Sequence, residues 1–137
     1  TLPFQLIGAD WINGEELAEY LNFRKLKGVY FMPITYKPFY GGFKDKYCNG
    51  IQIIITDKKL FMPYEIQIHI LEALLKLYPE KDILKKYGKK QDMFEKATGT
   101  AKLREKLLDG LSANIIIESY QEELKDFKLK REKYLLY

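Results

Sequence analysis

The segment from Tyr64 to Tyr78 is the strongest constraint on the fold of this chain. It carries apolar residues on more than one side of an α-helix: Ile66, Ile68, Ile70, Leu71, Leu74, Leu75 and Leu77. A helix with this pattern must be covered by other elements on more than one side. Pro63 suits the first helical turn, since its missing N–H costs nothing there, and Pro79 ends the helix. We therefore predict one central, buried helix.

Three segments that precede this helix are predicted to be β-strands. Residues 4–7 alternate weakly between apolar and polar side chains, and Gly8 is expected to end this first strand. Residues 29–35 are rich in β-branched and aromatic side chains, which favours a second strand. Residues 51–56 are strongly apolar and predict a third strand.

A helix is predicted between the first two strands. Asn13 suits its N-cap position, and Glu16 three residues later completes a capping-box pattern. Ile12 and Leu17 flank this start at the spacing of a hydrophobic staple. Gly28 is expected to close the connection to the second strand.

The order strand, helix, strand, strand, helix constrains how the strands run. A right-handed crossover places the first two strands parallel, and the third is expected to run antiparallel to the second. The predicted fold is α+β: a small mixed three-stranded sheet with helices packed on it and a helical C-terminal third. No repeat or second domain is evident, so residues 1–137 are predicted to form a single domain.

The last third of the chain is predicted to be helical. Residues 91–97 form a short helix, Thr100 caps a second that stops at Gly110, and Ser112 caps a long final helix. The final helix carries apolar side chains at helical spacing: Ile116, Tyr120, Leu124 and Phe127. Residues 80–90 are charged and predict a surface loop with one helical turn.

Composition limits the classes of protein to which the chain can belong. Its 137 residues are 47% apolar, which is enough for one hydrophobic core. The net charge of +4 is a mild bias that only weakly indicates an anionic partner. Its single cysteine excludes an internal disulfide, and no apolar run approaches the ~20 residues of a membrane span. The first residue is Thr1, so the sequence alone does not decide whether the protein is exported.

The sequence lacks the residue patterns of the common catalytic and metal sites. His69 and Cys48 are the only residues of their types and have no metal-ligand spacing. His69 is interpreted as a locally hydrogen-bonded helix residue and Cys48 as a small buried hydrophobe, although a Cys–His nucleophile pair is the open alternative. Adjacent glutamates at 15–16 and 122–123 are interpreted as solvated helix faces. We predict no catalytic residue, metal or cofactor within the chain.

Two features rise above this background. The only tryptophan, Trp11, follows the first strand, where it is either a core anchor or a platform for a sugar ring. The long loop between the second and third strands interleaves aromatic residues with lysines, a pattern that stacks on sugars or bases and holds anionic groups. The alternative is that half of these rings pack inward while the lysines are solvated.

Several segments taken in order resemble the NamZ-like exo-β-N-acetylmuramidase family. Residues 4–14, FQLIGADWING, resemble its segment FELIGAPWIDG. Residues 36–38 and 48–53, YKP and CNGIQI, resemble its FTP and C-x-G-V-Q-I segments, and Thr56-Asp57 matches the TD that follows. Near the end, the matching residues are Gly99-Thr100, Leu103-Arg104, Gly110 and the stretch 131–137, REKYLLY. Asp10 and the Tyr36-Lys37 pair depart from the family pattern.

The resemblance implies the C-terminal domain of a two-domain bacterial protein. In that family an upstream Rossmann-like domain carries the catalytic acid, and the substrate lies in the cleft between the two domains. The whole protein removes N-acetylmuramic acid from the non-reducing ends of peptidoglycan fragments. The resemblance also implies export to the periplasm, the cell exterior or a lipoprotein anchor.

We predict that this chain forms a substrate-cleft and packing domain of such a hydrolase, with a muramic-acid-containing sugar as its ligand. The candidate substrate-binding residues, chosen by residue type, are Trp11, Tyr36, Lys37, Tyr40, Lys44 and Lys46. The alternative is a non-catalytic module for nucleic acid or another anionic polymer. The basic stretch at residues 125–131 does not support that alternative, because cations at a helix end complement the helix dipole.

Overall fold

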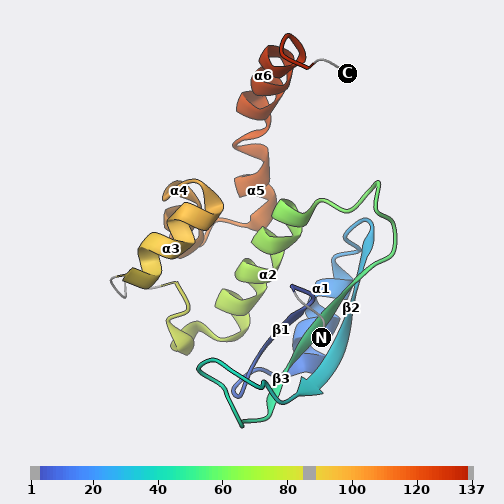
Figure 1. Cartoon of the computed structure of the whole chain (residues 1–137), viewed down its shortest axis with the longest axis vertical. Coiled ribbons are helices and arrows are strands. Elements are labelled where there is room, and N and C mark those ends of the chain that lie inside the picture. Colours follow the sequence, from blue (N-terminus) through green and yellow to red (C-terminus); the bar gives the residue numbers. More distant parts are fainter. Residues whose placement is uncertain (1–3, 85–88, 136–137) are drawn as a thin grey trace. The chain divides into compact units, whose positions relative to one another are not determined.

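The computed structural model of the chain describes residues 4–84 and 89–135 (Figure 1). The chain clusters into two compact units, Thr1–Ile83 and Leu84–Tyr137. The first unit contains the strands and the predicted central helix, and the regular elements in the described part of the second are helices. The single domain over residues 1–137 stays a prediction.

The first unit follows the predicted order of elements. Its elements are β1 (Leu6–Ala9), α1 (Gly14–Phe23), β2 (Val29–Tyr36), β3 (Cys48–Ile55), α2 (Pro63–Leu77) and a short 3-10 turn, η1 (Pro79–Lys81). Pro63 occupies the first turn of α2, as predicted. Of the charged stretch at residues 80–90, the helical turn is confirmed in η1, whereas residues 85–88 lie outside the described residues.

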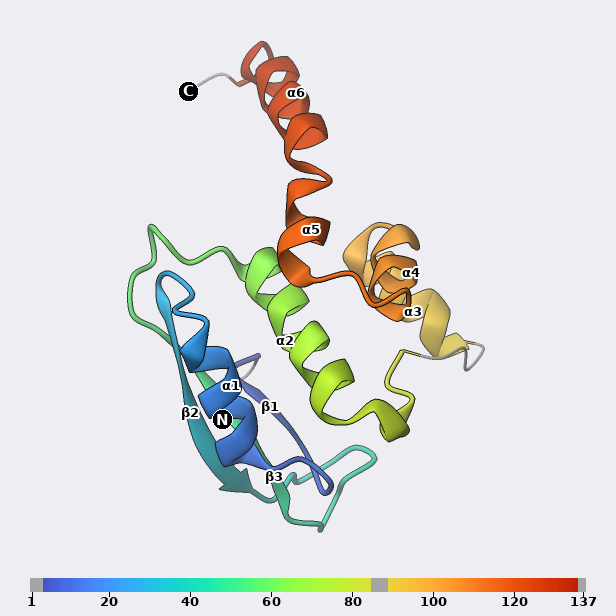
Figure 2. The ribbon, with the colours of Figure 1, turned by 180° about the vertical axis from the view of Figure 1, so that it is seen from behind.

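The sheet confirms the predicted strand directions but not the mixed pairing. The strand order is β1-β3-β2, and β3 runs antiparallel to both neighbours (Figure 2). The first two strands are parallel to each other, as the crossover rule requires, but they do not touch, so the sheet is purely antiparallel. The most apolar strand takes the central position, where it is paired on both edges.

Strand β1 begins and ends later in the sequence than predicted, at Leu6–Ala9 and not at residues 4–7. Gly8 lies inside the strand and pairs with Gly50 of β3, so it does not end β1. A Cβ on Gly8 would lie 2.9 Å from the Cε1 atom of Tyr36. The same Cβ would lie 2.8 Å from the carbonyl oxygen of Asn49 in β3, so the backbone of the neighbouring strand and the Tyr36 ring both require a glycine here, and the chain does not turn at this residue.

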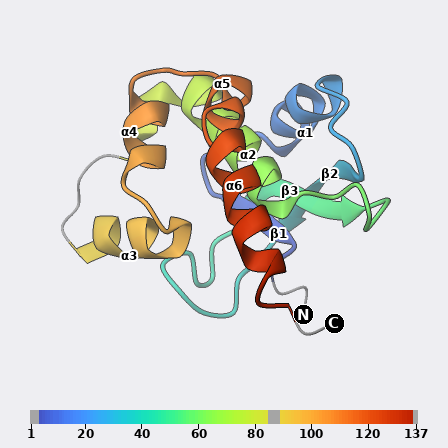
Figure 3. The same ribbon diagram turned by 90° about the horizontal axis from the view of Figure 1, so that it is seen from above.

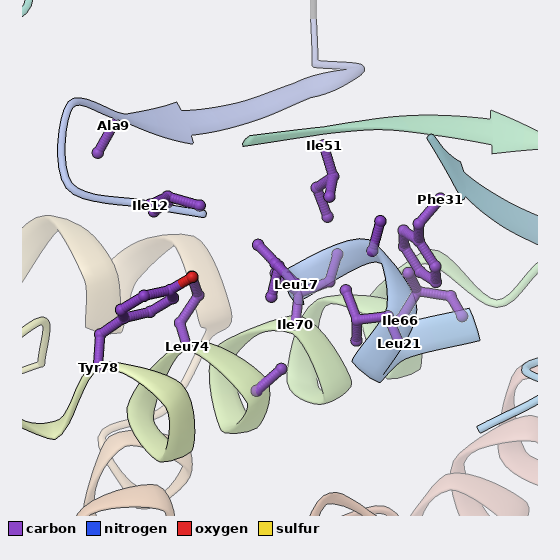
Figure 4. Close-up of a cluster of buried hydrophobic side chains, with 12 residues drawn as sticks. Ala9, Ile12, Leu17, Leu21, Phe31, Ile51, Ile66, Ile70, Leu74 and Tyr78 are labelled. Carbon is purple, nitrogen blue, oxygen red and sulfur yellow. The ribbon is translucent and has the colours of Figure 1, made fainter. Parts of the chain in front are cut away.

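Helices α1 and α2 cover one face of the sheet (Figure 3). Side chains from all three strands and both helices meet there in one core, which includes Leu17, Leu21, Phe31, Ile51 and Ile70 (Figure 4). Buried positions on α2 include 66, 68–70 and 72–74, which confirms that this helix is covered on more than one side.

The start of α1 is held by a residue far along the chain. Asn13 caps the helix, and its side-chain oxygen accepts hydrogen bonds from the backbone N–H groups of Glu15 and Glu16. The Asn13 N–H, which a capping-box glutamate would bind, donates instead to the hydroxyl of Tyr78 at 2.9 Å. The same hydroxyl donates to the Asn13 carbonyl at 3.2 Å, so the end of α2 fixes the start of α1.

The described residues of the second unit form four helices: α3 (Lys89–Thr98), α4 (Lys102–Leu108), α5 (Ala113–Glu118) and α6 (Gln121–Glu132). Arg104 of α4 is buried and its Nε atom donates to Glu95 of α3 at 3.1 Å. Acidic residues occupy the first turn of α6 and basic residues its last turn, as the dipole argument predicted.

The predicted long final helix is wrong, because it is interrupted between α5 and α6. The hydroxyl of Ser119 donates to the carbonyl of Ile116 at 2.6 Å and accepts from the ammonium of Lys106 at 2.5 Å. A serine that bonds its preceding turn competes with the backbone ladder of a helix. The N–H of Tyr120 then donates to the carbonyl of Ile117, three residues earlier and not four as in an α-helix, and a new helix begins.

Candidate functional site

The predicted site residues lie at one end of the sheet. Tyr36, the last residue of β2, pairs with Cys48, the first residue of β3. Ala9, the last residue of β1, pairs with Asn49. The turn after β1 and the loop at residues 37–47 therefore leave the sheet at the same end. This antiparallel register brings together residues that are about thirty positions apart in the sequence.

Short turns fix the shape of the loop at residues 37–47. The N–H of Lys44 donates to the carbonyl of Gly41, and the N–H of Lys46 donates to that of Phe43, each at 3.1 Å. Gly41 and Asp45 adopt positive φ angles of 91° and 64°, which the two reversals of the chain require. Phe43 packs against the core of the first unit and anchors the loop.

Three aromatic rings of this loop stand in solvent. Phe39 is 87% exposed, Tyr40 is 82% exposed and Tyr47 is 71% exposed. The ammonium of Lys37 lies 5.8 Å from the centre of the Tyr47 ring, within the range of a cation–π contact. Exposed apolar rings in a loop that is anchored by a partly buried neighbour are typical of a binding surface. The inward packing predicted for half of the rings is seen for Phe43 but not for Phe39, Tyr40 and Tyr47, and the stacking of these rings on a sugar stays a prediction.

An ion pair joins the loop to the turn after β1. The ammonium of Lys46 lies 3.3 Å from the carboxylate of Asp10, and both side chains are partly exposed. Lys44 is exposed, and among the described residues no carboxylate pairs with it. A carboxylate ligand at this end would therefore meet Lys46, which Asp10 already neutralises, and two lysines, Lys37 and Lys44, for which the described residues show no carboxylate partner.

Tyr36 lies where β1, β2 and β3 meet. Its ring covers Gly8, and its side chain is partly buried. Burial raises the pKa of the Tyr36 hydroxyl, and the neighbouring Cys48 adds to the rise. Tyr36 is therefore a neutral phenol at physiological pH, able to donate or accept one hydrogen bond.

Trp11 has a different environment from the other candidates. Its ring packs edge-on against Tyr78, with the centroids 5.3 Å apart and the planes at 68°. The ammonium of Lys81 lies 5.7 Å from the indole ring centre, and the side chain contacts the core of the first unit. This environment supports the core-anchor interpretation, while the sugar platform stays a prediction.

The structure adds three residues to the predicted set. Phe39, Tyr47 and Asp10 lie in or beside the loop but were not among the predicted binding residues. The two rings were detectable as part of the aromatic–lysine pattern. Asp10 was detectable only as a departure from the family segment, and its link to Lys46 spans 36 residues.

Comparison with known proteins shows the family to which the chain belongs. The whole chain, residues 1–137, matches the family described as "Exo-beta-N-acetylmuramidase NamZ, C-terminal". The chain belongs to this family. It is 34% identical over 137 residues to the peptidoglycan beta-N-acetylmuramidase NamZ of Bacillus subtilis (strain 168), covering all of this chain and 32% of that protein. The resemblance stated from the sequence is confirmed.

A solved structure confirms the fold of this NamZ C-terminal chain. The crystal structure of a DUF1343 family protein from Bacteroides fragilis NCTC 9343 superposes with a TM-score of 0.90 at 31% identity. The match covers 100% of this chain and 36% of the other. The chain thus spans about a third of the length of the relatives it matches.

Cys48 offers no nucleophile in this family member. Its side chain is fully buried at the start of β3. Burial raises the pKa of the thiol, the carboxylate of Asp10 adds to the rise, and Lys46 opposes it. A buried thiol that stays protonated is unreactive, because the thiolate is the nucleophile. The interpretation of Cys48 as a buried hydrophobe is confirmed.

His69 is hydrogen-bonded, but not to a local partner as predicted. Arg24 donates from Nη1 to the Nδ1 atom of His69 at 3.0 Å and to the buried carboxylate of Glu72 at 2.5 Å. A guanidinium has no acceptor, so Nδ1 of His69 must be the unprotonated nitrogen. The histidine therefore belongs to a polar network that joins α1 to α2. Within the described ranges, no group of three or more potential metal ligands is present.

Proposed function

We propose that this chain is the C-terminal part of a peptidoglycan-degrading exo-β-N-acetylmuramidase and forms one wall of its substrate cleft. The family match over residues 1–137 carries the proposal. The relative from Bacillus subtilis, three times as long, is itself named a peptidoglycan beta-N-acetylmuramidase. The exposed loop at residues 37–47, called the aromatic–lysine loop below, is the part of this chain best suited to contact a sugar.

The reaction of the whole protein is the hydrolysis of a terminal glycosidic bond. Water adds across the bond, which releases N-acetylmuramic acid and leaves a hydroxyl on the shortened glycan. Glycosidases use two carboxyl groups on either side of that bond. In this chain Asp10 is held by Lys46 and Glu72 is buried against Arg24, so neither is placed to donate a proton. The family resemblance implies an upstream Rossmann-like domain that carries the catalytic acid, and we propose this division of roles for the parent protein.

The chemistry of muramic acid fits the loop. Its pyranose ring presents an apolar face that can stack on an exposed aromatic side chain, and Tyr40 is the candidate. Its lactyl group carries a carboxylate, which Lys44 can pair with directly. Lys46 and Lys37 add positive charge, although Asp10 neutralises one and the Tyr47 ring holds the other. Tyr36 would provide a neutral hydroxyl at the base of the loop.

The substrate sets the location and the partners that we propose. Peptidoglycan lies outside the cytoplasmic membrane, so the parent protein is proposed to be exported or lipoprotein-anchored in a bacterium. In the described part of the chain, no helix combines the length and apolar character of a membrane span. The nucleic-acid alternative has no support from the comparisons, since the matched family and the Bacillus subtilis relative are both named for NamZ.

Ligand titration tests the cleft-wall role. Amide and side-chain NMR signals of the chain are followed during titration with N-acetylmuramic acid and, separately, with N-acetylglucosamine, which lacks the lactyl carboxylate. We expect shifts at Tyr40 and Lys44 that are larger for the muramic sugar. Equal responses to both sugars would remove the carboxylate role of Lys44. An unperturbed loop with both sugars would contradict the proposed wall.

The parent protein provides the test of activity. Release of N-acetylmuramic acid from the non-reducing end of a peptidoglycan fragment is measured by chromatography. We expect release by the parent and none by the 137-residue chain alone. Cleavage by this chain without an upstream domain would overturn the division of roles.

A further inference from the structure

A large apolar groove lies between α2 and the edge of the sheet. It has a volume of about 920 Å³ and is lined by side chains of β1, β3 and α2, among them Ile7, Ile53, Ile70 and Leu74. All of its lining residues belong to the first unit. The groove is separate from the aromatic–lysine loop, which contributes none of the lining residues.

Among the described residues, β1 pairs with only part of this side of β3. β1 pairs with β3 only from Leu6 to Ala9, and one further hydrogen bond joins the Ile53 N–H to the Gln5 carbonyl at 2.8 Å. Phe4 then has a φ of 61°, which turns the backbone out of strand geometry. Ile54 and Ile55 at the end of β3 therefore have no neighbour from β1 and line the groove.

The composition of the groove differs from that of the chain. None of its fourteen lining residues is charged, although 31% of the chain is charged. Its polar side chains are three glutamines, Gln5, Gln52 and Gln67. Depletion of charge combined with large apolar side chains marks the centre of a protein–protein interface. A sugar would find aliphatic side chains here but no charged group for a carboxylate.

We infer that this groove is the surface on which the upstream domain of the same protein docks. The inference rests on the two-domain parent proposed above. The matched family is described as the C-terminal part, and the relatives are about three times as long as this chain, so a large partner belongs to the same polypeptide. An uncharged groove requires an uncharged, apolar surface on that partner. Opposite the glutamines, the partner should present groups that hydrogen-bond to side-chain amides.

The position of the groove separates docking from substrate binding. α2 forms one wall of the groove, whereas the aromatic–lysine loop leaves the sheet at the residue 36–48 end. Docking at α2 thus leaves Tyr40 and Lys44 available to face a cleft. The exposed amide of Gln67 lies on the groove, where a new charge would be buried against the partner at a high cost.

The test uses the full-length parent carrying Gln67→Lys. Asn114→Lys is the matched control, since it changes an exposed helical amide to the same side chain outside the groove. Hydroxyl-radical footprinting reads the labelling of Phe61 and Leu71, which are partly exposed in this chain. We expect strong protection of both in the parent and in the control, and a several-fold rise in labelling in Gln67→Lys. Circular dichroism verifies that each variant is folded.

Three results would overturn the inference. The first is high labelling of Leu71 in the unmodified parent, and the second is equal labelling in Gln67→Lys and Asn114→Lys. The third is protection that depends on protein concentration and follows a monomer–dimer equilibrium in sedimentation, which would assign the groove to a second copy. Release of N-acetylmuramic acid is measured on the same samples. Protection without release would contradict the proposed function and leave the docking surface intact.

Discussion

Gly14 at the start of α1 lies directly against Gly50 near the start of β3. A Cβ on Gly14 would be 2.3 Å from the Gly50 carbonyl oxygen. A Cβ on Gly50 would in turn be 1.9 Å from the carbonyl oxygen of Ile7 in β1. Three backbones thus approach as closely as glycine permits. The two segments that most resemble the NamZ-like family, residues 4–14 and 48–53, meet at this point.

This contact predicts a large loss of stability for Gly50→Ala. A clash with backbone atoms cannot be relieved by a rotamer change, so the strand or the helix must shift, at a cost of about 3 kcal/mol or more. Gly42→Ala is the control, because a Cβ at that position would have nothing within 4 Å and the φ of Gly42 is not positive. Urea unfolding should show the loss only for Gly50→Ala. A stable Gly50→Ala variant would contradict the close approach.

Local sequence signals predicted the elements of the first unit well. The Asn13 cap, the Pro63 start and the apolar pattern of α2 each depend on residues that are near in sequence. The central position of β3 could not be predicted in this way, because strand order depends on pairing between distant segments. The Tyr78 bond to Asn13, 65 residues apart, was likewise invisible to local patterns.

The candidate site was predictable in residue type and less so in arrangement. The aromatic–lysine pattern correctly indicated an exposed loop. Which rings face solvent depends on the turns at Gly41 and Asp45 and on the burial of Phe43. The break before α6 also escaped prediction, since the helical spacing of apolar residues continues through Ser119 while its hydroxyl bonds the preceding turn.

The polar network between α1 and α2 predicts unequal effects for its two cations. Glu72 has a side chain only 4% exposed, and it is bound by Arg24 at 2.5 Å and by Lys76 at 2.7 Å. Arg24→Ala leaves this buried carboxylate half compensated and should cost about 3 kcal/mol. Lys76→Ala removes a side chain that is 52% exposed and should cost less than about 1 kcal/mol. Equal losses in urea unfolding would contradict this ranking.

The same network predicts that the free energy of unfolding depends on pH through the titration of His69. Burial lowers the pKa of His69, the charge of Arg24 lowers it further, and Glu72 opposes the shift. The unfolded chain therefore binds more protons than the folded one between that lowered pKa and about 6.5. Stability should fall as the pH decreases through this window and level off below it.

The variant His69→Gln isolates this effect, because it leaves the other titrating groups in place. The difference in unfolding free energy between the wild-type protein and His69→Gln is measured from pH 7 to pH 4. The wild-type protein should lose stability relative to the variant as the pH falls. A difference that does not change with pH would show that the pKa of His69 is not lowered.

Substitution of the Tyr40 ring and of the Lys44 charge in the exposed loop should weaken sugar binding in different ways. Tyr40→Ala removes a ring that is 82% exposed, so the free energy of unfolding should change little while sugar binding weakens. A lost stacking contact corresponds to about 1 kcal/mol, or roughly fivefold in the dissociation constant. Because the ring acts on the pyranose face, the loss should be similar for N-acetylmuramic acid and N-acetylglucosamine.

Lys44→Met should behave differently from Tyr40→Ala. It removes a lysine that pairs with no carboxylate among the described residues, whereas Asp10 holds Lys46 and the Tyr47 ring lies beside Lys37, so it should weaken binding of N-acetylmuramic acid alone. Lys58→Met, which changes an exposed lysine beyond the other end of β3, is the control and should affect neither sugar. Binding is measured by NMR titration at two salt concentrations, since an exposed ion pair weakens as salt rises. If Lys44→Met weakens both sugars equally, the lactyl carboxylate is bound elsewhere.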